Sequence, residues 1–340
     1  MRLMLPKSCF VLLAVLSVIA AIVGLLVGPV QISPVVLIDM LFSDHDQTRD
    51  EMIIQVIRLP RMLLSFLIGA VLAICGAVMQ GLFRNSLADP SLIGVSAGAS
   101  AGASFVIVFG AILFPTSVLG LSVVSIGAFA GGLLAAWVVY RLASSSEGTS
   151  VATMLLAGIA ISALAGALNQ LFSFLADNDM LRRISLWQMG SLESADWQQI
   201  TYCALTTGVL MILLPRESRA LNAMLLGESE ARHLGIGVEW LKRRLIIYTS
   251  LGVGIAVAVA GTIAFVGLVV PHLIRLLIGP NHRYLLPASA LLGGLLLVSA
   301  DAVSRVAVAP AELPIGVVTA LLGVPFFISI LIRQRNRVYA

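Results

Sequence analysis

Side chains able to carry out chemistry are few in this chain and lie far apart. The four histidines are widely separated and the three cysteines stand inside apolar runs: His45, His233, His272, His282, Cys9, Cys75 and Cys203. No spacing typical of a zinc site, a disulfide framework, a hydrolase nucleophile or a phosphate-binding loop occurs. We therefore expect no catalytic residue, no bound metal and no nucleotide site. If the chain moves a solute uphill, another chain supplies the energy.

Arginines beside apolar runs are the most unusual charged residues. Arg58 and Arg61 precede the run "MLLSFLIGAVLAICGAVMQGL", and Arg305 follows another such run. Pro60 suits the first position of a helix, so Arg61 is expected in the first turn, where a cation opposes the helix dipole by roughly 0.3–1 kcal/mol. Such a placement suggests that a partner's carboxylates compensate. Arginines that anchor the chain at the membrane surface are the alternative.

The composition is that of a membrane protein. Of the 340 residues 59% are apolar and 11% are charged, and the mean hydropathy is +1.03. Soluble proteins are about 25% charged. The pI of 9.2 therefore reflects Lys and Arg that flank membrane helices, and we expect membrane lipid but no nucleic acid as a partner. The first apolar run is long enough to span a bilayer and no small-residue cleavage site follows it, so we interpret it as a helix.

Apolar runs predict ten membrane crossings in a single transmembrane domain, residues 1–340. Eight runs of roughly twenty residues lie near 9–28, 60–82, 91–114, 117–141, 150–175, 197–214, 284–304 and 314–332. The stretch between Arg244 and Arg275 is too long for one crossing and short for two. Because basic clusters close both its ends, we expect it to cross twice, turning near Gly261. The fold class is then all-α integral membrane, with both termini cytoplasmic.

The distribution of basic residues supports this orientation. Fifteen of the 21 Lys and Arg residues fall on the cytoplasmic side. Six remain outside: Arg49, Arg58, Arg61, Arg182, Arg183 and Arg305. The spans themselves hold almost no ionisable group, which argues against a proton- or sodium-coupled carrier.

Small residues recur at four-residue spacing in two of the predicted helices. They are Gly94, Gly98 and Gly102 in one helix and Gly127 and Gly131 in the next. Such stripes favour close packing of helix backbones, and a smooth wall of a translocation path is the alternative.

The cytoplasmic loop at 215–241 predicts two short helices. Pro215 ends the preceding helix, Ser218 can cap a new one, and Gly227 and Gly235 can end the two short helices. Helices this short need a surface to dock on. That surface is either the chain's own helix ends or a separate cytoplasmic subunit, and apolar residues in the loop favour the subunit: Leu225, Leu226 and Leu234.

Four stretches resemble the FecCD-type permease family, the membrane subunits of binding-protein-dependent ABC importers for ferric siderophores, haem and cobalamin. They are "RLPRMLLSFLIGAVLAICGAVMQGLFRNSLADPSLIGVSAGAS", "MLLAGIAISAL", "LLGESEARHLGIG" and "GTIAFVGLVVPHLIRLLIGPNHRYLLP" with "SADAVSRVAVAPAELPIGVVTALLGVPFF". Together they cover most of residues 57–327 in family order.

This resemblance implies a type II ABC importer permease in the bacterial inner membrane. Two copies would form a homodimer with the pathway on the two-fold axis, two ATPase subunits would lie below and one periplasmic binding protein would dock above. ATP and Mg would belong to the ATPase, and this chain would bind no cofactor of its own.

The resemblance also implies roles for particular residues. Docking of the binding protein falls on Arg58, Arg61 and Arg305. Coupling to the ATPase falls on the loop residues Leu225, Leu226, Gly227, Glu228, Ala231, Leu234 and Gly235. The gate falls at the start of the fifth helix, on Ser150, Val151, Ala152 and Thr153, although the family's small polar residues are here replaced at 151 and 152. His272 of "VVPHLIR" is expected to pack at a helix end rather than ligate haem.

The cargo is suggested by one segment. "LRRISLWQMGSL" most resembles the haem-importing branch, so haem is the expected transported substrate. Arg182 and Arg183 could attract its propionates at the entrance, or be ordinary surface charges. A ferric siderophore or cobalamin is the first alternative, and a self-sufficient secondary transporter is a more distant one.

Overall fold

The computed structural model describes residues 4–42, 48–113, 117–118, 121–146 and 148–338, and these are almost entirely helical. Seven helices are long and apolar enough to cross a membrane: α1 (Pro6–Leu26), the continuous Arg49–Leu82 helix, α6 (Val123–Ala143), α7 (Val151–Leu175), α9 (Trp197–Arg216), α12 (Val238–Ala260) and α14 (His282–Val306). Three more contain shorter apolar segments: α5 (Val95–Leu113), α13 (Val266–Ile278) and α15 (Ile315–Val338). These are the ten segments predicted from the sequence.

Short elements connect these helices. They are α2 (Pro34–Phe42), the 3-10 helix η2 (Pro90–Ile93), α8 (Asn178–Met189), α10 (Ser218–Met224) and α11 (Glu228–His233). Two antiparallel pairs of two-residue strands complete the described elements: β1 (Ser117–Val118) with β2 (Leu121–Ser122), and β3 (Ser144–Ser145) with β4 (Gly148–Thr149).

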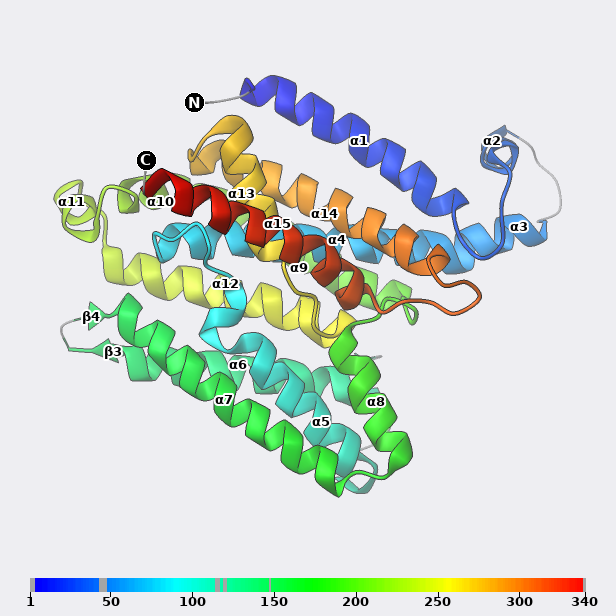
Figure 1. Ribbon diagram of the computed structural model, residues 1–340, viewed down its shortest axis with the longest axis horizontal. Helices are drawn as coiled ribbons and strands as arrows, with labels where there is room; N and C mark the ends of the chain where they lie inside the picture. The colour runs from blue at the N-terminus through cyan, green and yellow to red at the C-terminus, as the bar shows by residue number, and fades with distance from the viewer. Residues whose placement is uncertain (1–3, 43–47, 114–116, 119–120, 147, 339–340) are drawn as a thin grey trace.

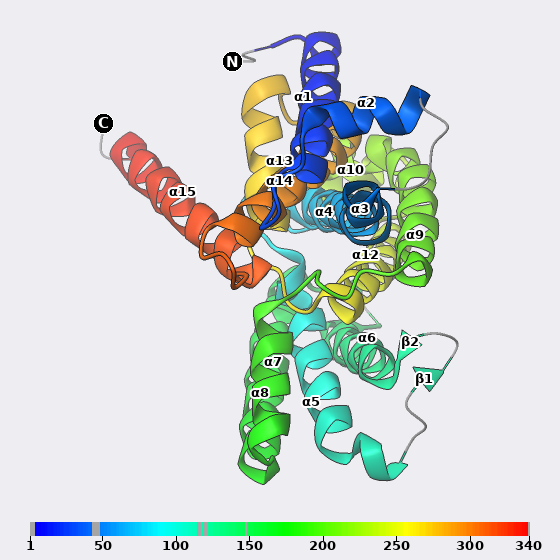
Figure 2. The same cartoon turned by 90° about the vertical axis from the view of Figure 1, so that its right-hand side faces the viewer.

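The second long helix is the centre of the fold. It consists of α3 (Arg49–Met52), the π-helical η1 (Ile53–Arg58) and α4 (Leu59–Leu82), and nearly all of α4 is buried. In Figure 2 it is seen close to end-on, with α1, α14, α12 and α9 around it. At Gly69 its backbone meets that of Gly293 in α14, and at Gly76 it meets that of Gly267 in α13, so a Cβ at either glycine would collide with a carbonyl group.

Close glycine packing also joins α5 to α6 in a second group of helices that includes α7 and α8 (Figures 1 and 2). Gly98 faces the backbone of Gly131, and Gly102 faces that of Gly127. The packing interpretation is therefore confirmed for these four glycines, whereas Gly94 lies before α5, where it ends η2 at φ +78°.

The two ends of the molecule differ in what they carry. The first and last described residues, α10, α11 and the β3–β4 pair lie at one end, which we call the inner end; α2, α3 and the turn at 307–314 lie at the other, the outer end (Figure 1). Both termini lie at the same end, as an even number of crossings requires.

The predicted turn near Gly261 is confirmed. Helix α12 ends at Ala260, and Gly261 adopts φ +71°, which few residues other than glycine tolerate. Its Cα also faces the carbonyl oxygen of Trp187, so no Cβ would fit there. Residues 261–265 then lead into the short helix α13.

The predicted start of the helix near Arg61 was wrong. A capping box between Thr48 and Glu51 starts a helix at Arg49, and η1 runs directly into α4. Pro60 has no N–H to donate, and the preceding π-helical turn, in which the Leu59 N–H donates to the carbonyl of Ile54, leads into it without a break. Arg61 is thus not in a free first turn, and the helix dipole does not explain its placement.

Candidate functional site

The arginines at the outer end are buried. Arg58, Arg61 and Arg305 have exposed fractions of 4%, 7% and 4%. Arg61 Nε donates to Asp301 Oδ1 at 2.7 Å, and its Nη1 donates to Glu312 Oε2 at 2.7 Å. We call Arg61, Asp301, Arg305 and Glu312 the outer ion cluster.

Arg305 binds the first helix as well as the cluster. Its Nε lies 3.2 Å from Asp301 Oδ2, and its Nη2 donates to the carbonyl of Gly24 in α1 at 2.8 Å. The cluster therefore joins α1, α4, α14 and the segment just before α15.

Arg58 holds the outer end of α1. Its guanidinium donates to the carbonyls of Leu25 at 2.7 Å and Leu26 at 2.5 Å, and also to that of Val30. The last carbonyls of a helix lack partners within it and carry the negative end of its dipole. Arg58 thus supplies both hydrogen bonds and a compensating charge.

This geometry corrects the reasoning from the sequence. Arg61 was expected to need the carboxylates of a partner, but carboxylates and carbonyls of this chain already satisfy all three arginines. Their predicted role in docking is not tested by these contacts. Asp301 and Glu312 were missed. The spacing of Asp301 four residues before Arg305 on one helix was the available signal.

The other two predicted outer residues, Arg182 and Arg183, are exposed on α8. Arg183 lines a cavity of about 560 Å³ between the start of α6, α8, the start of α9 and the end of α12. Asp196 and Gln199 line the same cavity, so it mixes a cation with a carboxylate and an amide. It could receive a polar group, but it is not a purely cationic site.

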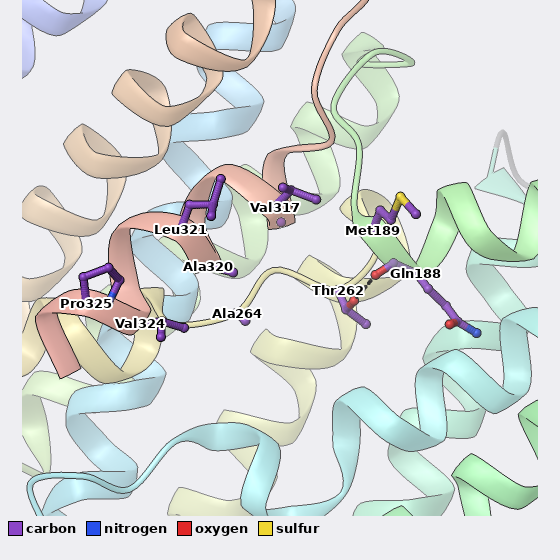
Figure 3. A pocket seen from close by; sticks show the side chains of 10 residues that line it. Gln188, Met189, Thr262, Ala264, Val317, Ala320, Leu321, Val324 and Pro325 are labelled. Carbon is purple, nitrogen blue, oxygen red and sulfur yellow. Dashed lines mark hydrogen bonds between the residues drawn. The ribbon is translucent and has the colours of Figure 1, made fainter. Parts of the chain in front are cut away.

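A second cavity, of about 530 Å³, lies beside the end of α8 (Figure 3). Its walls come from α8, from the connector after α12 and from α15, through residues such as Met189, Ala264 and Leu321. Thr262 Oγ1 donates to the carbonyl of Gln188 and so ties the connector to α8. The lining is mainly apolar and carries no charged side chain, so it suits apolar surface rather than an ion.

The predicted coupling residues divide into two kinds. Leu225, Leu226 and Leu234 are 41%, 67% and 62% exposed. The remaining four residues hold the two short helices in shape, and we call them the frame of the loop. Ala231 is buried, Glu228 is paired with Lys242, and Gly227 and Gly235 take φ +132° and +80°. These positive φ values are why glycine stands at both turns.

The two short helices dock on the chain's own helix ends. Helix α10 contacts α4 and α14, and α11 contacts α12. Asn222 of α10 donates to Asn281 Oδ1 at 2.9 Å and accepts from the N–H of His282 at 2.9 Å. Ser218 was wrong as the predicted cap, because Glu217 occupies the cap position and Ser218 is buried. Docking on the chain itself accounts for the frame and leaves the three leucines uncovered.

A buried lysine lies between this loop and the start of α7. Lys242 is 1% exposed, and its Nζ donates to Thr149 O at 2.6 Å, Glu228 Oε2 at 2.8 Å and Glu239 Oε1 at 3.3 Å. Glu239 Oε2 in turn accepts from the Thr149 N–H at 2.7 Å. We call Glu228, Glu239 and Lys242 the inner ion cluster. No local pattern indicated this cluster, because Lys242 opens an ordinary basic run.

The predicted gate residues follow Thr149 directly. Ser150 caps α7: its Oγ accepts from the Thr153 N–H at 3.2 Å and from Thr153 Oγ1 at 3.0 Å. Ser150, Ala152 and Thr153 are exposed and Val151 is partly buried. The first turn of α7 is therefore a small, accessible surface held by a cap.

Among the described residues, no group of three His, Cys, Asp or Glu side chains could hold a metal ion. Cys9, Cys75 and Cys203 are buried thiols without disulfide partners. His272 packs edge-on against the ring of Phe326, with 6.3 Å between ring centroids. That contact agrees with the packing role expected for this histidine.

Comparison with known proteins identifies the family. Residues 14–333 match the model of the FecCD transport family. The chain belongs to this family. It is a multi-pass membrane permease subunit of an ABC importer, not itself an enzyme, as the sequence predicted.

Relatives of the chain are named for different transported substrates. A hemin transport system permease protein, HmuU, of Yersinia pestis is 45% identical over 83% of each chain. A cobalamin import system permease protein, BtuC, of Halobacterium salinarum is 44% identical over 83% of this chain and 73% of its own. The vitamin B12 import system permease BtuC of Salmonella typhimurium is 40% identical over 95% and 94%.

A solved structure shares the fold. A protein described as a metal-chelate type ABC transporter, in an inward-facing conformation, superposes with a TM-score of 0.82 and 30% identity, covering 97% of this chain and 99% of that one. The permease fold predicted from the sequence is confirmed.

Proposed function

We propose that this FecCD permease carries haem from a periplasmic binding protein into the cytoplasm by alternating access. The observation that carries the proposal is the 45% identity to a hemin permease over 83% of both chains. The segment 181–192, which forms most of α8 and borders both cavities described above, supports it. Cobalamin permeases at 44% and 40% identity make cobalamin the main competitor, with a ferric siderophore beside it.

We further propose the assembly in which this subunit works: a homodimer in the bacterial inner membrane, two ATPase subunits that hold ATP and Mg, and one periplasmic binding protein. The exposed leucines of the 215–241 loop support an ATPase contact at the inner end, since apolar side chains on short helices favour a covering partner. Docking of the binding protein is proposed at the outer end. There Arg58, Arg61 and Arg305 would act by fixing α1, α4 and α14. Arg182 and Arg183, which are exposed on α8, would instead attract the propionates of haem at the substrate entrance.

Reconstitution tests the cargo. The chain, its ATPase and its binding protein would be placed in proteoliposomes, and ATP-dependent uptake of haem, cobalamin and a ferric siderophore would be compared. Haem uptake that an excess of cobalamin or of the ferric siderophore does not reduce supports the proposal. Uptake of cobalamin or the siderophore in its place would reassign the cargo, and uptake by the chain alone would support a secondary transporter.

The exposed leucines test the coupling role. Changing Leu225 and Leu226 together to Asp should release the ATPase during purification, because two charges would replace the apolar contact. The matched control is Leu276→Asp, since Leu276 is 50% exposed but lies on α13 outside the loop. Retention of the ATPase by the double variant would contradict the assignment.

A further inference from the structure

One charged side chain connects the loop that faces the proposed ATPase with the start of α7. Lysine has three N–H donors, and Lys242 uses all three on three different segments: Glu228 of α11, Glu239 of its own helix α12, and the carbonyl of Thr149 at the end of β4. The side chain is nearly inaccessible, with 2% of its surface exposed. A buried ammonium is costly unless its partners stay in place, so these three segments are held in register.

Thr149 is connected to the inner ion cluster by two hydrogen bonds. Its carbonyl accepts from Lys242, and its N–H donates to Glu239, which is itself paired with Lys242. Gly148, at φ +125°, places no side chain against the Glu239 carboxylate and so permits this approach. Thr149 is therefore gripped through both of its backbone polar groups.

Thr149 is followed immediately by the cap of α7. The next residue, Ser150, accepts from the Thr153 N–H, so a displacement of residue 149 displaces the first turn of α7. On the other side, Glu228 is the first residue of α11, next to the exposed leucines. Figure 1 places α11, the start of α12 and the β3–β4 pair together at the inner end.

We propose that Lys242 is a positioning residue that carries movement of α11 to the first turn of α7. The inference rests on the proposed function, in which the ATPase contacts the 215–241 loop and the start of α7 gates the pathway. The rim of the inner ion cluster allows such movement: Glu228 and Glu239 keep 27% and 40% of their side-chain surface exposed, and Arg232 Nη2 lies 3.5 Å from Glu239 Oε1 as an exposed additional partner.

The test measures movement of α7 directly. Ala152, an exposed residue of the first turn, would be changed to Cys in a chain whose three buried native cysteines are replaced by Ala. The complete transporter in nanodiscs would be labelled with a water-soluble maleimide, with and without ATP and vanadate. Coupling between sites typically changes an equilibrium about 5- to 150-fold. We expect a nucleotide-dependent change in labelling rate within that range, and its loss in the Lys242→Met background while ATP hydrolysis continues.

Two further variants separate transmission from folding. Glu228→Gln removes the charge that pairs with Lys242 at nearly constant volume on a side chain that is 27% exposed, so it should fold and should also diminish the labelling change. Arg244→Met is the matched control: Arg244 lies two residues further along α12 and pairs with Glu217 at 3.2 Å, away from Thr149. It should retain the full change.

Persistence of the labelling change in both Lys242→Met and Glu228→Gln would overturn the proposal. A wild-type labelling rate that is the same with and without ATP and vanadate would also overturn the proposal, since the first turn of α7 would then not move. Failure of the proposed function is read separately, from whether an ATPase subunit co-purifies and whether uptake requires ATP.

Discussion

Two buried ion clusters stand at opposite ends of this permease, and they differ in what they join. The outer ion cluster links three long helices and holds Asp301, which is 1% exposed, between two arginines. The inner ion cluster links a six-residue helix, the start of α12 and a strand end, and its two glutamates are partly exposed. Long helices around the nearly buried Arg61, Asp301 and Arg305 make a fixed junction, with only Glu312 partly exposed at its edge, whereas short segments with two partly exposed glutamates make one that can rearrange. The outer ion cluster holds α1, α4 and α14 together, whereas the inner ion cluster transmits movement from α11 to α7.

The largest effect is expected at Asp301. Asp301→Leu should destabilise the protein by about 3–5 kcal/mol, because it leaves buried Arg305 without a carboxylate and deprives Arg61 of one of its two. Denaturant titration of the purified chain would measure the loss. Asp301→Asn keeps the shape and one acceptor and should lose less. Equal stability of wild type and Asp301→Leu would show that the outer ion cluster does not hold these helices together.

Arg58→Met comes next. It leaves the last carbonyls of α1 without partners, at a cost of about 1–3 kcal/mol confined to that helix. Hydrogen exchange should therefore accelerate in residues 20–27 while α4 stays protected. Arg49→Met, at an exposed arginine of the same long helix, serves as the control. Uniform acceleration throughout the chain would contradict this local role.

Lys242→Met should cost less than Asp301→Leu, about 1–2 kcal/mol, although it removes a fully buried charge. The two glutamates left behind are already partly hydrated, and methionine fills most of the vacated volume. The same denaturant titration measures it. A loss as large as that of Asp301→Leu would erase the distinction between a fixed and a rearranging end.

The smallest effect is expected at Arg244. Its side chain is 46% exposed, so its ion pair with Glu217 is screened by water and worth about 0–1 kcal/mol. Raising the salt concentration should therefore narrow the stability difference between wild type and Arg244→Met, because salt screens an exposed ion pair. A loss of stability comparable to that of Lys242→Met would mean that burial does not decide how much each ion pair at the inner end contributes to stability.

Patterns that depend on neighbours in the chain were predictable from the sequence. Apolar runs located ten helices, and the glycine at 261 marked the turn between two of them. The stripe at Gly98 and Gly102 predicted close packing because one helix face is set by four-residue spacing.

Contacts between distant residues were not predictable in the same way. Arg61 pairs with Asp301 across 240 positions, so nothing local distinguished an arginine bound within the chain from one awaiting a partner. The helix start failed for a related reason. Residues 49–58 are too polar to resemble a membrane span, and Pro60 is as suitable for a helix start as for a helix continued from a π-helical turn.

The hydrogen bond between Gly24 and Arg305 has a consequence for biosynthesis. Its partners are separated by 281 positions, so the donor for this carbonyl of α1 is made only after most of the chain has left the ribosome. At a synthesis rate of about 5–20 residues per second, that delay is roughly 15–55 seconds. Helix α1 therefore gains its contact with Arg305 long after its contacts with Arg58, which lies only about 30 positions further along the chain. Chains truncated before α14 should insert α1 and hold its outer end through Arg58 alone.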